Sequence, residues 1–359
     1  MYAEITGWGK CAPPAILTND DLATFLDTSD EWIYTRTGIK RRHISHVPCS
    51  EMARVGSEHA IACAGIDPTE LDLVILGTTT PDQFIPNSAS TVINAIGASN
   101  AAGFDVNSAC TSFLYSLNIA TDMIKAGSIK TALVIGVEKT TRLLDWGKRE
   151  SAVLFGDGGG AVVLQATQEP LGLLGAKLSL VPHTREMLSM PEFGVDLSHQ
   201  QQHDFYPSLT FEGQEIFKNA VKGMHEACKD ALTKTGLTQD DIDFFVPHQA
   251  NVRIIKTLAK RMAFDMDNVM VCVNEYGNCS AGTIPLSLCD ALEAGRIKPG
   301  MTLLTASFGA GLTCGAGVIK WGERTTPIAT SEAKLPPCNQ TAIEILQPAI
   351  DAAKEKYGE

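Results

Sequence analysis

The sequence predicts an α/β fold made of two related halves, and three observations support this. Short apolar segments such as 131–137 and 302–307 lack polar alternation, which is typical of strands buried on both faces. Segments with apolar residues at helical spacing, such as 216–232, alternate with these strands. A stretch of the first half also reappears in the second half. Buried strands joined by helices indicate layers of helix and sheet.

Two pairs of segments carry the repeat. Residues 65–76 and 236–247 both read as a helix end, a loop and a buried strand, at an offset of 171 residues. The Ala-Gly-Ser-Ile-Lys of 126–130 returns as Ala-Gly-Arg-Ile-Lys at 294–298, at an offset of 168 residues, and each precedes an apolar strand. Two matches in the same order at nearly the same offset indicate a duplicated unit of roughly 170 residues.

The repeat places the two halves at residues 1–168 and 169–323. The remaining residues, 324–359, differ in composition. A linker rich in Thr, Pro and Ser precedes a predicted helix over 342–356, which Pro348 interrupts. This extension lies outside the repeat, and the sequence assigns it no role.

Composition excludes several classes of protein. Hydrophobic residues make up 44% of the chain and charged residues 19%, which excludes a disordered chain. No apolar run approaches the roughly 18 residues of a membrane span, and no basic-then-apolar start resembles a signal peptide. The 10 cysteines lack paired CxxC spacing, which argues against a zinc site or a disulfide scaffold and favours a reducing cytoplasm. A net charge of −12 disfavours nucleic acid as a partner.

Cys110 is the first candidate for chemistry. It falls between a predicted strand at 104–106 and a stripe of apolar residues at helical spacing over 113–124. A cysteine at such a turn lies near a helix N-terminus, where free N–H groups and the helix dipole favour a thiolate and an oxyanion. The alternative is an ordinary buried core cysteine, which is the commoner case.

His248 and Asn278 occupy comparable positions. His248 follows the predicted strand 242–246, at the carboxyl end, where α/β folds bind their ligands. Asn278 lies 168 residues after Cys110, so the repeat makes these two positions equivalent and predicts that two helix N-termini face one another. The alternatives are a histidine that satisfies its own loop and a plain turn at Asn278.

A cysteine, a histidine and an asparagine admit two classes of enzyme. One transfers an acyl group through a thioester on Cys110 and then forms a carbon–carbon bond. The other is a papain-like hydrolase, which has the same residue order. The hydrolase signature Cys-Gly-Ser-Cys-Trp and a secretory context are missing, and a duplicated α/β core does not suit that class. A scaffold that lost its activity is a third, non-enzymatic possibility, against which the complete trio argues.

A basic face follows His248 directly. Over 251–262, Arg253, Lys256, Lys260 and Arg261 fall on one arc of a predicted helix and apolar residues on another. In a chain of net charge −12, one interpretation of this arc is a site for docking phosphates or an acidic partner, and the other is a solvated surface helix. The glycine-rich run 156–160 is different. An apolar segment follows it where a phosphate cradle needs a helix, so we expect a tight β-turn there.

Several motifs together are specific to one family. They are Asp-Glu-Trp-Ile at 30–33, Arg-Thr-Gly-Ile at 36–39, the Cys110 segment, Val-Pro-His-Gln-Ala-Asn at 246–251, Tyr-Gly-Asn at 276–278 and Phe-Gly-Ala-Gly-Leu-Thr at 308–313. With these motifs, residues 1–323 resemble the β-ketoacyl-acyl-carrier-protein synthase III family of condensing enzymes. The resemblance implies a thiolase fold, in which duplicated βαβαβαββ halves form five layers in the order αβαβα.

The resemblance also implies an activity. An acyl-CoA primer and a malonyl-acyl carrier protein (malonyl-ACP) would be joined by decarboxylative Claisen condensation through an acyl thioester on Cys110, which initiates fatty acid synthesis. The chain would be a cytoplasmic homodimer that needs no metal and no redox cofactor. A related condensing enzyme of secondary metabolism is the alternative.

Roles for single residues follow from the same resemblance. Cys110, His248 and Asn278 would be catalytic, with the N–H groups of Cys110 and Ala310 as the oxyanion hole. The CoA-binding residues would be Trp32, Arg36, Thr37 and Arg149, and carrier-protein docking would use Arg253, Lys256, Lys260 and Arg261. Ser112, together with Ile85 from the partner protomer, would shape the acyl pocket. Ser112 and Ile85 depart from the family pattern, in which a glycine and an aromatic residue are usual.

Overall fold

Strands from both halves of the chain form one mixed sheet in the computed structural model, which describes residues 1–190 and 209–358. In this described part, the sheet has nine strands in the order β11-β12-β13-β8-β1-β7-β6-β4-β5. These strands are β1 (Tyr2–Cys11), β4 (Leu73–Gly77), β5 (Ala102–Val106), β6 (Thr131–Lys139), β7 (Asp157–Thr167), β8 (Gly172–Leu180), β11 (Phe244–Pro247), β12 (Thr302–Gly309) and β13 (Thr313–Lys320). Two small sheets pair β2 (Ala15–Thr18) with β3 (Arg41–Ile44) and β9 (Leu188–Ser189) with β10 (Thr210–Phe211).

The helices fall into long packing helices and short connecting ones. They are α1 (Asn19–Leu22), α2 (Asp30–Thr37), α3 (Cys49–Ala64), α4 (Ser88–Ile96), α5 (Ser112–Lys125), α6 (Arg149–Ala152), α7 (Gly213–Thr235), α8 (Val252–Arg261), α9 (Val273–Tyr276), α10 (Thr283–Glu293) and α11 (Ala342–Tyr357). No helix within 1–190 or 209–358 is long and apolar enough to cross a membrane.

The two halves of the sheet have the same strand order. The first half runs β5-β4-β6-β7-β1 and the second runs β11-β12-β13-β8, with β4 and β11 each parallel to its neighbour β6 or β12. The place of β5 is taken in the second half by one parallel bridge between Phe245 and Val269. The halves join where β1 pairs with β8 at Ala3 and Gly172. The boundaries at residues 168 and 323 stay a prediction.

Glycines at equivalent positions end the two equivalent helices. Gly65 closes α3 and Gly236 closes α7, both with left-handed backbone at φ +68° and +69°. A residue without Cβ adopts this conformation at least cost, which is why helices often end on glycine. Residues 65–76 and 236–247, which resemble each other in sequence, therefore form the same structure: a helix end, a 3₁₀ turn and a strand.

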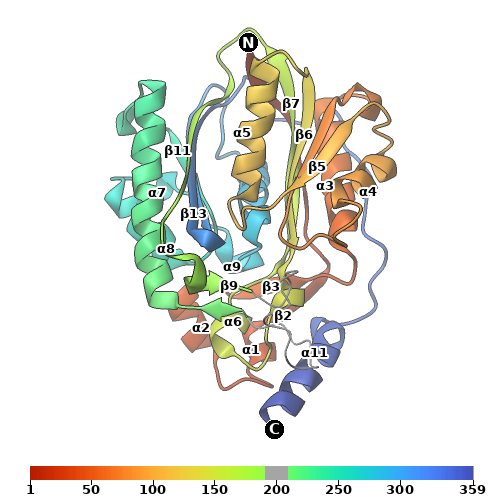
Figure 1. Ribbon diagram of the computed structural model, residues 1–359, viewed down its shortest axis with the longest axis vertical. Helices are drawn as coiled ribbons and strands as arrows, with labels where there is room; N and C mark the ends of the chain where they lie inside the picture. The colour runs from red at the N-terminus through yellow and green to blue at the C-terminus, as the bar shows by residue number, and fades with distance from the viewer. Residues whose placement is uncertain (191–208, 359) are drawn as a thin grey trace.

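The elements stack in five layers, as Figure 1 shows. Helix α5 lies between the strands of the two halves, α3 and α4 cover the outer face of the first half, and α7 and α8 cover that of the second. Phe113 and Leu117 of α5 share one buried core with Ile284 and Leu288 of α10 and with strand residues from both halves. The αβαβα order that the sequence predicted is confirmed.

The glycine-rich run 156–160 was expected to form a β-turn, and this prediction is wrong. Gly158 to Gly160 lie inside β7, which follows the short helix α6. The reason is the close approach of neighbouring strands. A Cβ at Gly159 would come within 2.0 Å of the carbonyl oxygen of Gly136 on β6, and one at Gly160 within 2.5 Å of that of Gly9 on β1.

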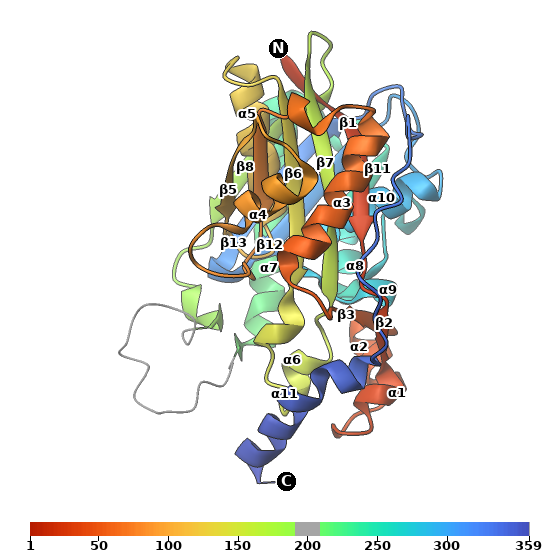
Figure 2. The same cartoon turned by 90° about the vertical axis from the view of Figure 1, so that its right-hand side faces the viewer.

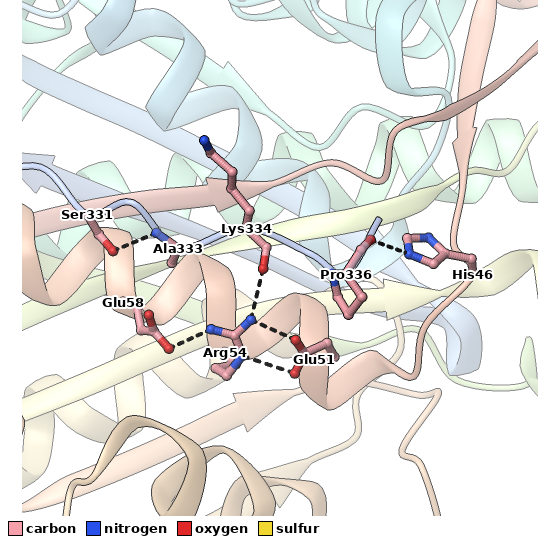
Figure 3. A network of polar contacts seen from close by, with 8 residues as sticks. All are labelled: His46, Glu51, Arg54, Glu58, Ser331, Ala333, Lys334 and Pro336. Atoms are coloured by element: carbon pink, nitrogen blue, oxygen red, sulfur yellow. Dashed lines mark hydrogen bonds and ion pairs between the residues drawn. The ribbon is translucent and has the colours of Figure 1, made fainter. Parts of the chain in front are cut away.

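The extension runs along α3 without helix or strand before it reaches α11 (Figure 2). The N–H groups of Ile328 and Ala329 donate to the carbonyls of Cys63 and Ala62 at the end of α3, at 3.0 and 3.2 Å. Further along, in Figure 3, Arg54 of α3 donates to the carbonyl of Lys334 at 3.0 Å. The extension is therefore held in place along the protein surface.

Three further contacts support this attachment. Arg54 is itself fixed by ion pairs with Glu51 and Glu58 at 2.6 and 2.7 Å, and the His46 ring bonds the carbonyl of Pro336 at 2.8 Å (Figure 3). Beyond this stretch, α11 runs unbroken through Pro348, so the predicted interruption is wrong. Burial of one apolar face of α11 against the core offsets the loss of one helical hydrogen bond at the proline.

Candidate active site

Cys110 lies in a tight turn between β5 and α5, as predicted. The Ser112 hydroxyl holds this turn, because it donates to the carbonyl of Ala109 at 2.6 Å and accepts from the N–H of Ser108 at 2.9 Å. Ala109 has the positive φ of +53°, a strained conformation for a residue with a Cβ that is common beside functional groups. The role of Ser112 in shaping the acyl pocket stays a prediction, and the structure adds that its hydroxyl braces the turn of the nucleophile.

Burial dominates the electrostatics of Cys110. The residue is 9% exposed, and loss of solvation raises the pKa of its thiol to about 12. Hydrogen bonds with the Ser280 side chain and with its own backbone N–H act in the opposite direction. The resting group is therefore a thiol at the N-terminal end of α5, and its proton must leave when it reacts.

His248 follows β11 at its carboxyl end, where the sequence placed it. Its Nδ1 lies 2.6 Å from the Thr283 hydroxyl, and its ring meets the edge of Phe308 with centroids 5.4 Å apart. Burial lowers the pKa of His248 to about 3, so the ring is neutral at physiological pH. Its Nε2 is buried without a hydrogen-bond partner in the described residues. One ring nitrogen is fixed and the other is free for a ligand.

Asn278 has its backbone fixed and one side-chain group free. Its N–H donates to the carbonyl of Leu154 at 2.9 Å, and its Oδ1 accepts from the N–H of Ser280 at 2.8 Å. Within 1–190 and 209–358, no hydrogen bond uses its Nδ2. The amide is thereby oriented with its NH₂ available as a donor.

The three residues meet at the point where the central helices begin. Cys110 precedes α5, and Asn278 precedes α10 by way of the 3₁₀ turn Ser280–Gly282. Strand β12 connects His248 to Cys110. Its Ser307 donates to the carbonyl of Cys110 at 3.0 Å, and its Phe308 contacts the His248 ring. In the described chain, no hydrogen bond joins Cys110 directly to His248 or Asn278.

The orientation of His248 distinguishes this site from that of a papain-like hydrolase. In such a hydrolase the asparagine orients the histidine, as the third member of the triad. Here Thr283 orients His248, and Asn278 is held by Ser280 instead. The two side chains therefore present free hydrogen-bonding groups, rather than forming a relay to the cysteine.

The predicted oxyanion hole lies beside a close backbone approach. A Cβ at Gly309 would come within 2.7 Å of the backbone nitrogen of Cys110 and within 2.9 Å of the Ala109 Cβ. Only glycine lets the 309–310 backbone pass this near, which explains the glycine before Ala310. The N–H groups of Cys110 and Ala310 as a pair stay a prediction that this approach supports.

Sequence reasoning missed a buried carboxylate behind the site. Glu138, on β6, accepts hydrogen bonds from the Thr78 and Thr80 hydroxyls, from the Thr79 N–H and, at 3.1 Å, from the Ser280 hydroxyl. Burial raises the pKa of Glu138. Because Ser280 also hydrogen-bonds Cys110, it connects this carboxyl to the nucleophile. A charged residue in an otherwise apolar strand was the signal that identifies it.

Three of the four predicted CoA-binding residues gather on one surface. The Trp32 ring has the Arg36 guanidinium 4.6 Å and the Arg149 guanidinium 4.5 Å from its centroid. Thr37 does not join them, because it is 3% exposed and its hydroxyl bonds the carbonyl of Ile33 and the N–H of Ile39 at the end of α2. Its role as a CoA-binding residue stays a prediction.

The predicted docking residues Arg253, Lys256, Lys260 and Arg261 are exposed on α8. Arg253 donates to the carbonyl of Thr35 at 3.0 Å, which joins the basic face to the surface around Trp32. In the part of the chain that the structure describes, none of the four forms an ion pair. Ile85 is 88% exposed, so it does not line a pocket in its own chain.

The chain matches known proteins along most of its length. The family described as 3-oxoacyl-[acyl-carrier-protein (ACP)] synthase III matches residues 104–180, and the C-terminal region of that synthase matches residues 232–321. A Vibrio cholerae serotype O1 protein named β-ketoacyl-[acyl-carrier-protein] synthase III 2 is 51% identical over 358 residues, which cover 100% of this chain and 99% of that protein. A Methylococcus capsulatus synthase III is 40% identical over 322 residues, covering 89% and 99%.

Solved structures agree with these relatives. A 3-oxoacyl-[acyl-carrier-protein] synthase III from Aquifex aeolicus VF5 is 38% identical with a TM-score of 0.83, and the match covers 89% of this chain and 100% of that one. The priming β-ketosynthase of a polyketide biosynthetic pathway is 32% identical with a TM-score of 0.84, covering 90% and 97%. These solved structures share the fold of this chain.

Proposed function

The chain belongs to the β-ketoacyl-[acyl-carrier-protein] synthase III family of acyltransferases, and from this premise we propose how its residues condense an acyl-CoA primer with malonyl-ACP to start fatty acid synthesis. One observation carries the proposal: among the described residues, the Nε2 of His248 and the Nδ2 of Asn278 have no hydrogen-bond partner, and both side chains lie beside a cysteine at a helix N-terminus. Two donors next to a nucleophile fit a reaction that passes through an enolate.

The first half-reaction loads the enzyme. The Cys110 sulfur attacks the carbonyl carbon of the acyl-CoA thioester, and the N–H groups of Cys110 and Ala310 stabilise the negative oxygen of the tetrahedral intermediate. The bond to the CoA sulfur then breaks, and the proton lost from Cys110 ends on the CoA thiol. The product is an acyl thioester on Cys110, which is held at the beginning of α5.

The second half-reaction makes the carbon–carbon bond. His248 Nε2–H and Asn278 Nδ2–H donate to the carbonyl oxygen of the malonyl thioester, and CO₂ leaves to give an enolate. The enolate carbon attacks the acyl carbonyl on Cys110, the carbon–sulfur bond breaks, and the thiolate takes up a proton. These steps use a thiol, an imidazole, an amide and backbone N–H groups, and call for no metal or redox cofactor.

Thr283 sets the tautomer that this mechanism needs. Its hydroxyl lies 2.6 Å from His248 Nδ1 and 3.1 Å from the carbonyl of Ser280, which can only accept. We assign the single hydroxyl proton to Nδ1, because the mechanism needs a donor at Nε2. A neutral imidazole that accepts at Nδ1 carries its proton on Nε2. The free nitrogen of His248 is then a donor, as the enolate requires.

Replacing Thr283 with valine should therefore slow malonyl decarboxylation by about tenfold while acylation of Cys110 changes little, because one orienting hydrogen bond to a buried ring is lost. The measurements are CO₂ release from malonyl-ACP and radiolabelled acyl transfer from acyl-CoA. Thr283→Ser, which keeps the hydroxyl, should restore the native decarboxylation rate. An equal loss of both half-reactions in Thr283→Val would show that Thr283 has no specific role in orienting the donor.

The two substrates approach over adjoining surfaces. We assign the nucleotide of CoA to Trp32, Arg36 and Arg149, because guanidinium groups stacked on an indole ring suit a planar base that carries phosphates. The carrier protein would dock on the four exposed basic residues of α8. The homodimer, in which Ile85 would reach the partner's acyl pocket, and the cytoplasmic location belong to the same proposal.

Reversing the charges of Lys260 and Arg261 should raise KM for malonyl-ACP about tenfold at low salt and leave priming by acyl-CoA unchanged. Both side chains are exposed on α8, and attraction between a basic surface and an acidic protein mainly affects association. Steady-state kinetics at low and high salt would measure this. Reversing Lys218 and Lys222 on α7 makes the same change in net charge and should have little effect. A priming defect alone would contradict the docking assignment.

Intact-mass spectrometry tests the proposed function directly. After incubation with CoA thioesters of increasing chain length, the protein should gain the mass of one acyl group, located on Cys110. No adduct with any thioester would overturn the proposal. The 32% identity to a priming β-ketosynthase of a polyketide pathway supports a second candidate, a role in secondary metabolism. A preference for a primer foreign to straight-chain fatty acids would favour that candidate.

A further inference from the structure

A cavity lies between α11 of the extension and the body of the protein. Its volume is about 240 Å³. Three parts of the chain line it: residues 25–27 after α1, residues 146–150 around the start of α6, and the inward face of α11. The side chains that matter below are Phe25, Asp27, Arg149, Lys354 and Tyr357.

This cavity adjoins the Trp32 surface through a shared side chain. Arg149 lines the cavity, and its guanidinium also lies over the Trp32 ring. It donates to the backbone carbonyl of Asp27 at 2.6 Å, and its Nε is buried without a hydrogen-bond partner among the described residues. Arg149 therefore connects the surface around Trp32 with the cavity, and its charge is available to both.

The chemistry of the walls suits a phosphorylated aromatic group. Phe25 and Tyr357 supply aromatic rings, and Arg149 and Lys354 supply positive charge. The carboxylates of Asp27 and Glu150 also belong to the lining. Asp27 is paired with Arg149 at 3.6 Å and is fully exposed, so it is the group that a phosphate displaces. Lys354 forms no ion pair in the described part of the chain, so its charge has no partner on the protein side.

The outer wall is firmly seated. The Tyr357 hydroxyl donates to Asp145 at 2.8 Å, and the side chain of Asp145 is 0% exposed. A Cβ at Gly147 would lie 2.5 Å from the Tyr357 ring, so only glycine lets the ring pack here. Ile350 and Ala353 are buried in the same core as Trp146. The last turns of α11 are thus fitted to the body rather than attached loosely.

We propose that α11 forms the outer wall of the site for the nucleotide end of the acyl-CoA primer, with Lys354 contacting a phosphate and Tyr357 and Phe25 bordering the adenosine. This inference rests on the proposed function and deepens it, since it adds the C-terminal extension to the substrate site. In this proposal the nucleotide occupies the cavity, whereas the acyl group and the pantetheine arm do not.

The test compares thioesters with and without a nucleotide. In Lys354→Glu, KM for acyl-CoA should rise about fivefold to tenfold, because attraction to a phosphate becomes repulsion. KM for the same acyl group on N-acetylcysteamine, which lacks the nucleotide, should stay unchanged, as should KM for malonyl-ACP. The matched control is Lys334→Glu, an equal charge change on the same extension at an exposed residue remote from the cavity.

A shortened chain ending at residue 340 provides the second variant, and its thermal unfolding would show whether the body still folds. It should show the same selective loss of affinity for acyl-CoA. Equal changes with both thioesters, or none with either, would overturn the role of α11. Failure of the proposed function is a separate result, in which the native protein accepts an acyl group from neither thioester.

Discussion

Replacing Cys110 with alanine is expected to abolish formation of the acyl-enzyme while malonyl decarboxylation continues. Acylation needs the sulfur, which no other group at the site replaces. Decarboxylation needs donors for the malonyl carbonyl, and His248 and Asn278 keep their positions because Thr283 and Ser280 hold them. Radiolabelled acyl transfer to protein should fall below detection, and CO₂ release from malonyl-ACP should remain measurable.

A second cysteine provides the control for this result. Cys228 is fully buried on α7, far along the chain from the site, and Cys228→Ala removes the same atom from the core. It should cost some stability, about 1 to 2 kcal/mol, and leave acylation intact. An acyl adduct that persists in Cys110→Ala would mean that another thiol is the nucleophile.

Replacing Asn278 with alanine should produce the opposite pattern. Cys110 should still accept an acyl group, whereas condensation should fall about 10²- to 10³-fold, or roughly 3–4 kcal/mol, which is the usual effect of losing one donor to a developing oxyanion. The donor in question is Nδ2, which the protein itself leaves unused. The two half-reactions would be measured separately, by acyl transfer and by CO₂ release.

The variant Asn278→Asp removes the NH₂ donor and keeps the size of the side chain. The aspartate keeps an oxygen that accepts the Ser280 N–H, but it has no NH₂ group, so its condensation should be as slow as that of the alanine variant. Loss of acylation in Asn278→Ala as severe as in Cys110→Ala would contradict this division of roles. Asn278 would then act as the orienting partner of His248, as in a papain-like enzyme.

The features that could be predicted from the sequence are those that depend on residues close together in the chain. Cys110 and His248 could be placed because each follows an apolar strand and precedes a helix, and Asn278 because the repeat gives it the position of Cys110. Turns, helix ends and strand lengths depend on residues that are neighbours in the sequence. Hydrophobic periodicity and helix-ending residues therefore predict them. The layered fold followed from the same signals.

The sequence could not predict contacts between distant segments. Thr283 orients His248 across 35 positions, and Glu138 reaches Ser280 across 142, and neither spacing leaves a periodic trace. The glycines of 158–160 were misread for the same reason, since the strands that crowd them come from β1 and β6.

The position of α5 and α10 at the centre of the stack has a consequence for folding. Each helix packs against strands from both halves, so neither half can satisfy its own apolar surface by itself. The two halves therefore share one pattern of strands and helices, but we expect neither half to fold as an independent unit. Unfolding should be a single cooperative event, and an isolated half of the chain should aggregate rather than persist as a soluble fragment.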